Sequence, residues 1–436
     1  MSYSQTQFTL SQCIDYALVH NPSIKTALVD EEIADKNKWV IASAGFPKLN
    51  AYGSFDDNVK IPVTPVPAAI FDQNAPPDVV VPLRFGSRYA TTGYLQVDQL
   101  IYNGSYLVAL KASKASKIYY GEALKQTVEN TIYEVSSAYF QALTAKKEME
   151  IQKENVERTR KLLDIVDLQY KNELIIKADR DRVLVSYNNE VSRLRRAQRD
   201  WQQAINNLQF RMGMSITETI ELKEINENLD SIIVNLGDAI VVNYDARADY
   251  RVLKAREQLQ ELQVKQYRSE YQPVVTAFGR YQYQKFRQEL EEVFEGDNWF
   301  NSQIIGLRLN VPIFNGLENR FEVQKARLDL LKAHIDVKRQ EQLIGLELAN
   351  AFKAYQTAVE NVKVARDNIA LAEEVYNVQL LLFEEGVGSY ADLLDATNSL
   401  EVSQLNYTTS MLAVYLARVE LARANGKLNE VVEWNY

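Results

Sequence analysis

Residues 383–400, FEEGVGSYADLLDATNSL, combine a turn with two glycines and a run of good helix formers. Gly386 and Gly388 permit backbone conformations that other residues avoid. The stretch YKNELIIKADRDRV, residues 170–183, lies 213 positions earlier in the chain and shows the same pattern. The two stretches therefore predict two helix-to-helix turns, at residues 172–177 and 385–389, each followed by a further helix.

The same order of segments occurs twice along the chain. Residues 21–55 resemble residues 247–281, with Pro47 and Pro273 at matching positions. LQVDQLIYNG at 95–104 resembles LRLNVPIFNG at 307–316. We predict two tandem structural repeats with short segments outside them; the repeats are 1–214 and 246–426, and the other segments are 215–245 and 427–436.

Each repeat is predicted to contain a helix, two strands, a very long helix, a turn and a final helix. Prolines are absent from residues 83–272 and after 312, so long helices are possible there. In the first repeat we expect strands at 47–64 and 89–102, and helices at 104–171 and 178–212. In the second repeat we expect strands at 273–287 and 302–314, and helices at 316–384 and 390–425. The fold is therefore expected to be dominated by α-helix.

The long helices carry a heptad-like apolar pattern that is typical of coiled coils. In the second repeat the apolar positions are Leu348, Phe352, Tyr355, Val359, Val362, Ala365, Ile369, Ala372 and Tyr376. A helix of this length spans roughly 100 Å at 1.5 Å per residue. We therefore expect helices much longer than those of ordinary globular domains.

The predicted strands alternate between apolar and polar residues, which gives each one an apolar face and a polar face. Leu307, Leu309 and Val311 show this pattern in the second repeat. A sheet in a soluble protein and a transmembrane barrel both carry this alternation. Four short strands cannot close a barrel, and a sheet edge cannot lie in lipid, so a membrane location would require several chains. Three chains would supply 12 strands.

Composition argues against several classes of function. The net charge of −9 argues against nucleic acid as the main partner. One cysteine, Cys13, and two histidines, His20 and His334, give no metal-ligand spacing and no pair of nucleophile and base, so we expect no metal, no cofactor and no enzyme. No run of 18 apolar residues and no signal peptide is visible, so the chain is expected to be either cytosolic or a mature form with an added start residue.

In combination, four features resemble the TolC family of outer-membrane efflux proteins across nearly the whole chain. They are the opening ALxxNPxI at 17–24, the prolines Pro47 and Pro273, the turns IYNG and IFNG, and the stretch at 383–400. The resemblance implies a homotrimer in the outer membrane of a Gram-negative cell. Four strands from each chain would build one 12-stranded β-barrel, which continues into an α-helical coiled-coil barrel in the periplasm. Residues 215–245 and the C-terminus would form a belt around that tunnel.

The resemblance also implies partners and functional residues. The partners would be a periplasmic adaptor, an inner-membrane transporter and outer-membrane lipid. The tips that dock the adaptor would contain Glu173, Leu174, Ile175, Gly386, Val387, Gly388 and Ser389. The gate would contain Asp392, Asp395, Asp179 and Phe383. Phe383 and Gly388 replace the family's tyrosine and arginine, so the usual latch to Asp179 is not expected.

Other interpretations remain open from the residues alone. Asp392 and Asp395 could instead be exposed helix charges that the helix dipole stabilises. The chain could be a soluble periplasmic coiled-coil adaptor, although an adaptor would carry one helical hairpin beside a glycine-rich β-domain. Cys13 is predicted to be a packed small residue and not an acylated anchor. Residues 62–82 and 287–297 are expected to form extracellular loops, and the cargo is left open between drugs, metals, siderophores and polypeptides.

Overall fold

The computed structural model describes residues 7–74, 76, 78–223, 242–293 and 296–433. The chain forms two compact units, and both repeats contribute to each of them. The helical unit contains residues up to 33, 117–257 and 332 onward, and the sheet unit contains residues 34–116 and 258–331. The sequence repeats are therefore not separate compact units, because each repeat supplies strands to one unit and helix pairs to the other.

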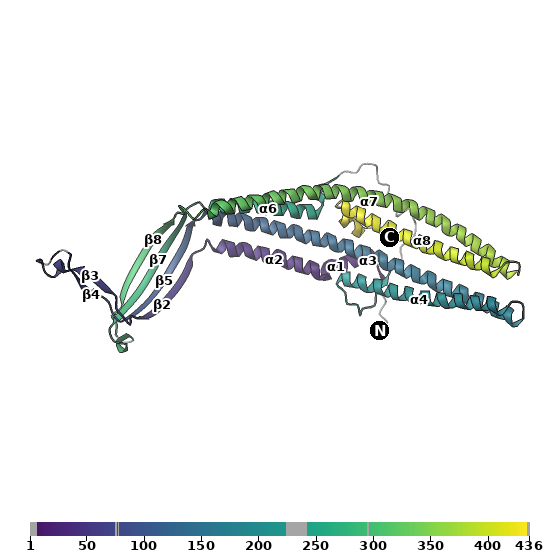
Figure 1. Cartoon of the computed structure of the whole chain (residues 1–436), viewed down its shortest axis with the longest axis horizontal. Coiled ribbons are helices and arrows are strands. Elements are labelled where there is room, and N and C mark those ends of the chain that lie inside the picture. Colours follow the sequence, from purple (N-terminus) through teal and green to yellow (C-terminus); the bar gives the residue numbers. More distant parts are fainter. Residues whose placement is uncertain (1–6, 75, 77, 224–241, 294–295, 434–436) are drawn as a thin grey trace. The chain divides into compact units, whose positions relative to one another are not determined.

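The helices and strands follow one another as in Figure 1. The first half contains β1 (Gln7–Phe8), α1 (Leu10–His20), α2 (Pro22–Ser43), β2 (Lys48–Asp57), β3 (Val63–Pro67), β4 (Val80–Arg84), β5 (Tyr89–Tyr102), α3 (Gly104–Lys171) and α4 (Lys177–Met212). The second half contains β6 (Glu221–Leu222), α6 (Ala248–Ser269), β7 (Val274–Arg287), β8 (Phe300–Asn310), α7 (Glu318–Glu384) and α8 (Tyr390–Ala424). Short 3₁₀ turns occur at Ala68–Ile70, Tyr244–Ala246, Glu291–Val293 and Leu428–Glu433.

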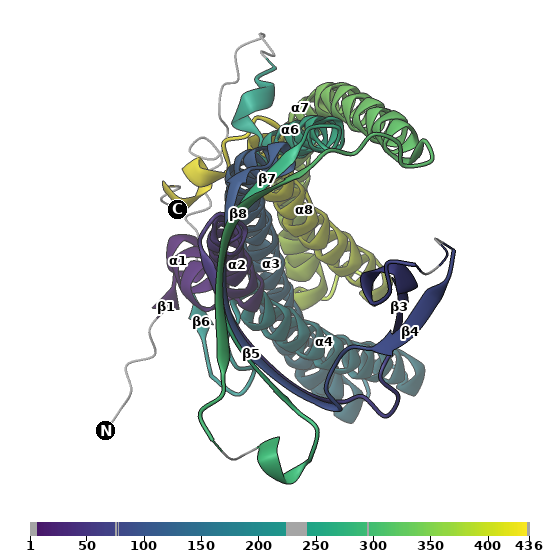
Figure 2. The same cartoon turned by 90° about the vertical axis from the view of Figure 1, so that its left-hand side faces the viewer.

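The sheet unit is built on one antiparallel sheet in the order β2-β5-β7-β8. The first repeat supplies β2 and β5 and the second supplies β7 and β8, so β5 and β7, one from each repeat, pair at the centre of the sheet. A second ribbon, β3 paired with β4, projects away from this sheet in both views (Figures 1 and 2). Residues 62–82 were expected to be a loop because of their prolines. They include this ribbon because a two-stranded ribbon has free edges, where a missing N–H is tolerated.

Several predicted boundaries were wrong, and local chemistry explains each difference. The strand predicted for 47–64 ends at Asp57, because the backbone and side chain of Asn58 bond to the carbonyls of Arg88 and Ser87 and turn the chain. The strand predicted to reach 314 ends at Asn310, because Pro312 offers no N–H. Gly316 and Leu317 have φ of 67° and 69°, so α7 cannot begin before Glu318.

The first helix of the first repeat is interrupted at Asn21, which was not predicted. Asn21 is extended, with ψ of 126°, as expected for a residue that precedes a proline. Its side-chain oxygen accepts from Ser23 N at 2.8 Å, and its side-chain nitrogen donates to the Arg211 carbonyl at 2.7 Å. These bonds satisfy polar groups at the break and connect it to the end of α4.

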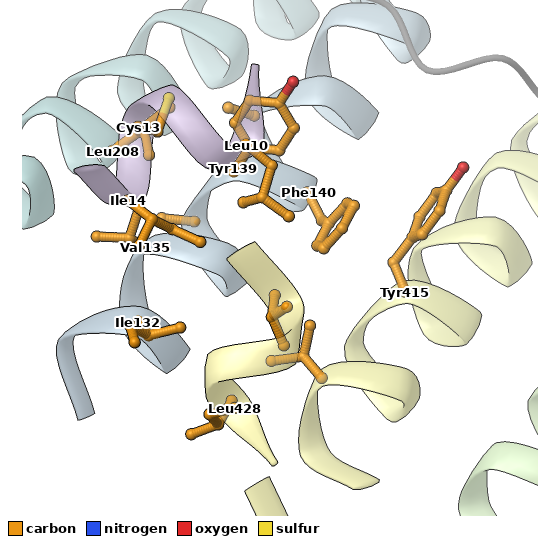
Figure 3. Packing of buried hydrophobic residues seen from close by; sticks show 14 of the residues in the cluster. Leu10, Cys13, Ile14, Ile132, Val135, Tyr139, Phe140, Leu208, Tyr415 and Leu428 are labelled. Atoms are coloured by element: carbon orange, nitrogen blue, oxygen red, sulfur yellow. The ribbon is translucent and has the colours of Figure 1, made fainter. Parts of the chain in front are cut away.

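The helical unit has one large apolar core, formed by α1, α3, α4, α7, α8 and the turn at Leu428–Glu433. Figure 3 shows the facing rings of Phe140 on α3 and Tyr415 on α8, which are stacked with centroids 4.5 Å apart. Cys13 is completely buried there, and burial raises the pKa of its thiol to about 12. An unreactive thiol in a packed core fits the expected structural role.

Part of the predicted belt segment, 215–245, packs on this core. β6 pairs in parallel with β1, and the Tyr139 hydroxyl donates to carbonyls on both sides of that pair, at Phe8 and Lys223. At the C-terminal side, Leu428 and Val431 are buried in the same core. Residues 224–241 and 434–436 of the predicted segments lie outside the described residues.

Candidate functional site: the two helix tips

The first tip joins α3 to α4 through residues 172–176. Glu173 has φ of 57°, a left-handed conformation that is unusual for a residue with a side chain. Its N–H bonds to the Tyr170 carbonyl at 3.0 Å, and Leu174 N bonds to the Gln169 carbonyl at 2.9 Å. These bonds end α3 by occupying its last carbonyls. They leave Leu174 and Ile176 exposed, whereas Ile175 packs inward.

The second tip joins α7 to α8 through residues 385–389. Gly386 has φ of 76°, and the amides of Val387 and Gly388 both bond to the Leu382 carbonyl. A Cβ at Gly388 would lie 3.0 Å from the backbone of Leu382 and Phe383, so the turn needs a glycine there for close packing. Ser389 caps α8, since its side chain accepts from Asp392 N. Val387 at the apex is 75% exposed.

A small apolar core packs the two hairpins together behind the tips. Val166, Val183, Phe383 and Leu393 are all buried in it, one from each of α3, α4, α7 and α8. Phe383, which was predicted at the gate, therefore points into the chain and not toward solvent. Its ring contacts Tyr390 edge-on, with centroids 6.5 Å apart. Phe383 holds the second tip in place by packing.

The three aspartates predicted for the gate are at the tips, where Asp392 and Asp395 are exposed and Asp179 is half-buried. Asp392 accepts a hydrogen bond from the Ser389 hydroxyl at 2.7 Å and stabilises the start of α8. Asp395 lies one turn further on the same helix and presents its carboxylate to solvent. The spacing of three residues places both carboxylates on neighbouring positions of one helix surface.

Asp179 is engaged on its own helix. Its carboxylate accepts from Arg182 at 3.3 Å, an exposed pair at spacing i,i+3. The ion pair that closes the first hairpin is Arg180 with Asp167, at 2.8 Å. This hydrogen bond to Asp167 raises the pKa of Arg180.

A cavity of about 260 Å³ lies between the hairpins near the tips and was not expected from the sequence. Its apolar wall includes Leu162, Ile165 and Leu380, and Arg158 stacks over the Tyr376 ring at 5.1 Å. A layer of buried polar side chains further along the same helices was also missed. The sequence contains a signal for this layer. Glu190 follows buried Val183 by seven residues, which is one heptad, so both residues occupy the same core-facing position of the helix.

Neither a metal centre nor a helical membrane span occurs in the part of the chain that the structure describes. Within that part, no three acidic, histidine or cysteine side chains come together as metal ligands. No described helix is both apolar enough and long enough to cross a bilayer.

Comparison with known proteins identifies the family. The sequence profile described as Outer membrane efflux protein matches residues 13–214 and 245–427. The outer membrane efflux protein BepC of Brucella suis is 20% identical, over 97% of this chain and 87% of BepC.

Two crystal structures share the fold. The CmeC outer membrane channel of Campylobacter jejuni is 17% identical with a TM-score of 0.75, over 96% of this chain and 85% of CmeC. The outer membrane protein VceC of Vibrio cholerae is 17% identical with a TM-score of 0.73, over 96% of both chains. The predicted fold class, helix-dominated with tandem repeats, is confirmed. The chain belongs to the outer membrane efflux protein family, as an efflux duct of the outer membrane and not an enzyme.

Proposed function

We propose that three copies of this chain form one duct that carries cargo passively from an inner-membrane pump across the periplasm and the outer membrane. Proteins of this family generally work with a periplasmic adaptor and an inner-membrane pump. The trimer is inferred from the sheet β2-β5-β7-β8. Its outer strands, β2 and β8, each pair with one strand within the described chain, which leaves one edge of each strand without a partner there. Strand edges without partners cannot lie in lipid, so neighbouring copies would pair them and close a 12-stranded barrel.

The exposed side chains of β8 support this assembly. Ile305, Leu307 and Leu309 are 92%, 74% and 64% exposed and share one face of the strand. A soluble sheet would bury such a face, whereas a strand in a bilayer presents it to lipid. The rival interpretation, a soluble periplasmic adaptor, does not explain an apolar face of this kind beside two strand edges without partners.

The proposed assembly predicts a trimer in detergent. The protein should be extracted from membranes only with detergent, and its mass after subtraction of bound detergent should be three times that of one chain. Light scattering coupled to size-exclusion chromatography measures this mass. A stable monomer or dimer in several mild detergents would contradict the shared barrel.

We propose the tips as the docking site of the adaptor. Leu174, Ile176 and Val387 are 73%, 66% and 75% exposed, although they are apolar and lie at turns. Exposed apolar residues grouped at one end of a hairpin pair are typical of an interaction surface. Glu173 and Ser389 flank them with polar groups, as at the rim of an interface.

Removing these apolar contacts should weaken binding of the adaptor. Burial of a leucine or valine stabilises a complex by about 1.5–3 kcal/mol, so Leu174→Ser with Val387→Ser should reduce affinity at least tenfold. Binding to the purified cognate adaptor would be measured by interferometry. Leu174→Met with Val387→Ile is the matched control, and it should bind like the wild type. Equal affinity of the serine and control variants would exclude the tips as the docking site.

A further inference from the structure

A layer of buried polar side chains crosses the helical unit between the two hairpins. It consists of Gln152 and Asn155 on α3, Glu190 and Arg193 on α4, and Glu401 and Gln404 on α8. All except Arg193 are at least nine-tenths buried. Buried charges are costly unless they are paired, so this group, the polar layer, requires an explanation.

Glu401 connects the hairpins within the polar layer. Arg193 Nη1 donates to Glu401 Oε2 at 2.5 Å and to Glu190 Oε1 at 3.1 Å. Gln152 Nε2 donates to the other oxygen of Glu401 at 3.1 Å. The carboxylate of Glu401 on α8 is therefore bonded to both helices of the first hairpin, α3 and α4.

The polar layer has one excess negative charge when both carboxylates are ionised. The charges that act on Glu190 are those of Glu401 from α8 and Arg193 from α4, and the polar-layer residues of α3 are the amides Gln152 and Asn155. Burial, and next the Glu401 carboxylate, raise the pKa of Glu190, while Arg193 opposes the shift. Two carboxylates beside one guanidinium are thus arranged to favour binding of one proton.

The hydrogen-bonding groups lead to the same conclusion. Among the described residues of the polar layer, three buried acceptors lack a partner: Gln152 Oε1, Gln404 Oε1 and Glu190 Oε2. One buried donor, Asn155 Nδ2, also lacks a partner. A proton on Glu190 Oε2 would convert an acceptor into a donor and leave two of each. Unpaired buried groups are rare in native proteins, and a protonated Glu190 gives the polar layer as many unpaired donors as unpaired acceptors.

We propose that the polar layer is a proton-sensitive joint between the two hairpins, which holds α8 against α3 and α4 when one proton is bound and loosens when that proton is lost. The direction of this pH dependence follows from the direction of the pKa shift of Glu190. A carboxyl whose folded-state pKa is raised binds more protons in the packed state than in the opened state. Packing is therefore favoured as the pH falls through this raised value and is weakened as the pH rises above the ordinary glutamate range.

Glu190→Gln tests the joint, because glutamine is neutral at every pH and carries a donor as protonated glutamate does. The readout is amide hydrogen exchange of residues 400–408 in the purified full chain, with wild type and variant compared at the same pH so that intrinsic exchange rates cancel. At about pH 8 the variant should exchange about tenfold more slowly than the wild type. At about pH 5 the two should converge.

Two further variants distinguish a specific effect of the polar layer on hydrogen exchange from a general effect of removing a negative charge. Glu154→Gln removes an exposed carboxylate of α3 near the polar layer and should leave exchange unchanged. Glu401→Gln removes the negative charge beside Glu190, so the pH above which residues 400–408 lose their protection from hydrogen exchange should move to a lower value. The proposal is overturned if Glu190→Gln matches the wild type at both pH values, if Glu154→Gln has the same effect, or if Glu401→Gln leaves that pH unmoved. The readout does not depend on conduction or on adaptor docking.

Discussion

Asp392→Asn combined with Asp395→Asn is expected to reduce the preference of the reconstituted duct for cations. Three chains would place six carboxylates around one narrow passage, and a ring of like charge attracts counter-ions. An attraction of about 1 kcal/mol corresponds to about a fivefold preference, so the permeability ratio of potassium to chloride should fall by roughly that factor. Reversal potentials in planar bilayers under a salt gradient measure this ratio. Block by multivalent cations should weaken in parallel.

Asparagine is chosen because Asp392 also takes part in the cap of α8. Its side chain can still accept the hydrogen bond from the Ser389 hydroxyl, so the charge is removed while the start of the helix is kept. The matched control is Glu154→Gln with Glu157→Gln, which neutralises two exposed carboxylates at the same spacing on α3. Unchanged selectivity in the asparagine variant, or an equal change in the control, would return both aspartates to the role of ordinary helix charges.

The largest loss of stability is expected for Phe140→Ala. Phe140 is completely buried, stacks on Tyr415 with an angle of 4° between the rings, and joins α3 to α8 in the main core. Truncation of a buried phenylalanine removes apolar contacts and leaves a cavity, which costs about 3–5 kcal/mol. The unfolding temperature in detergent, followed by circular dichroism at 222 nm, the helix band, should fall by several degrees.

Phe210→Ala is the control for that measurement. Phe210 is on α4 near the same core but is 69% exposed, so its truncation should change the free energy of unfolding by no more than about 0.5 kcal/mol. A shift for Phe140→Ala as small as that for Phe210→Ala would show that the packing of α3 on α8 does not limit stability.

The pattern of residues is sufficient to predict the long helices, the two tips and the tandem repeat. These features depend on local chemistry that repeats along the chain. Proline-free runs of helix formers permit helices of this length, and Gly386 and Gly388 permit the sharp turn of the second tip. The ends of strands were less predictable where a single residue interrupts an alternating apolar pattern. Alternating Val59 and Ile61 suggested a longer strand, but the hydrogen bonds of Asn58 to the neighbouring strand end it first.

Contacts between distant segments required the tertiary structure. Phe383 matched a gate position in the sequence, yet it packs against Val166 and Leu393 because the two hairpins meet behind the tips. Glu190 and Glu401 are separated by most of a repeat, and only the packing of α8 on α4 brings them to one arginine. Burial there changes what a carboxylate does, because an exposed glutamate is an ordinary helix residue, whereas a buried pair that shares one cation favours the binding of a proton.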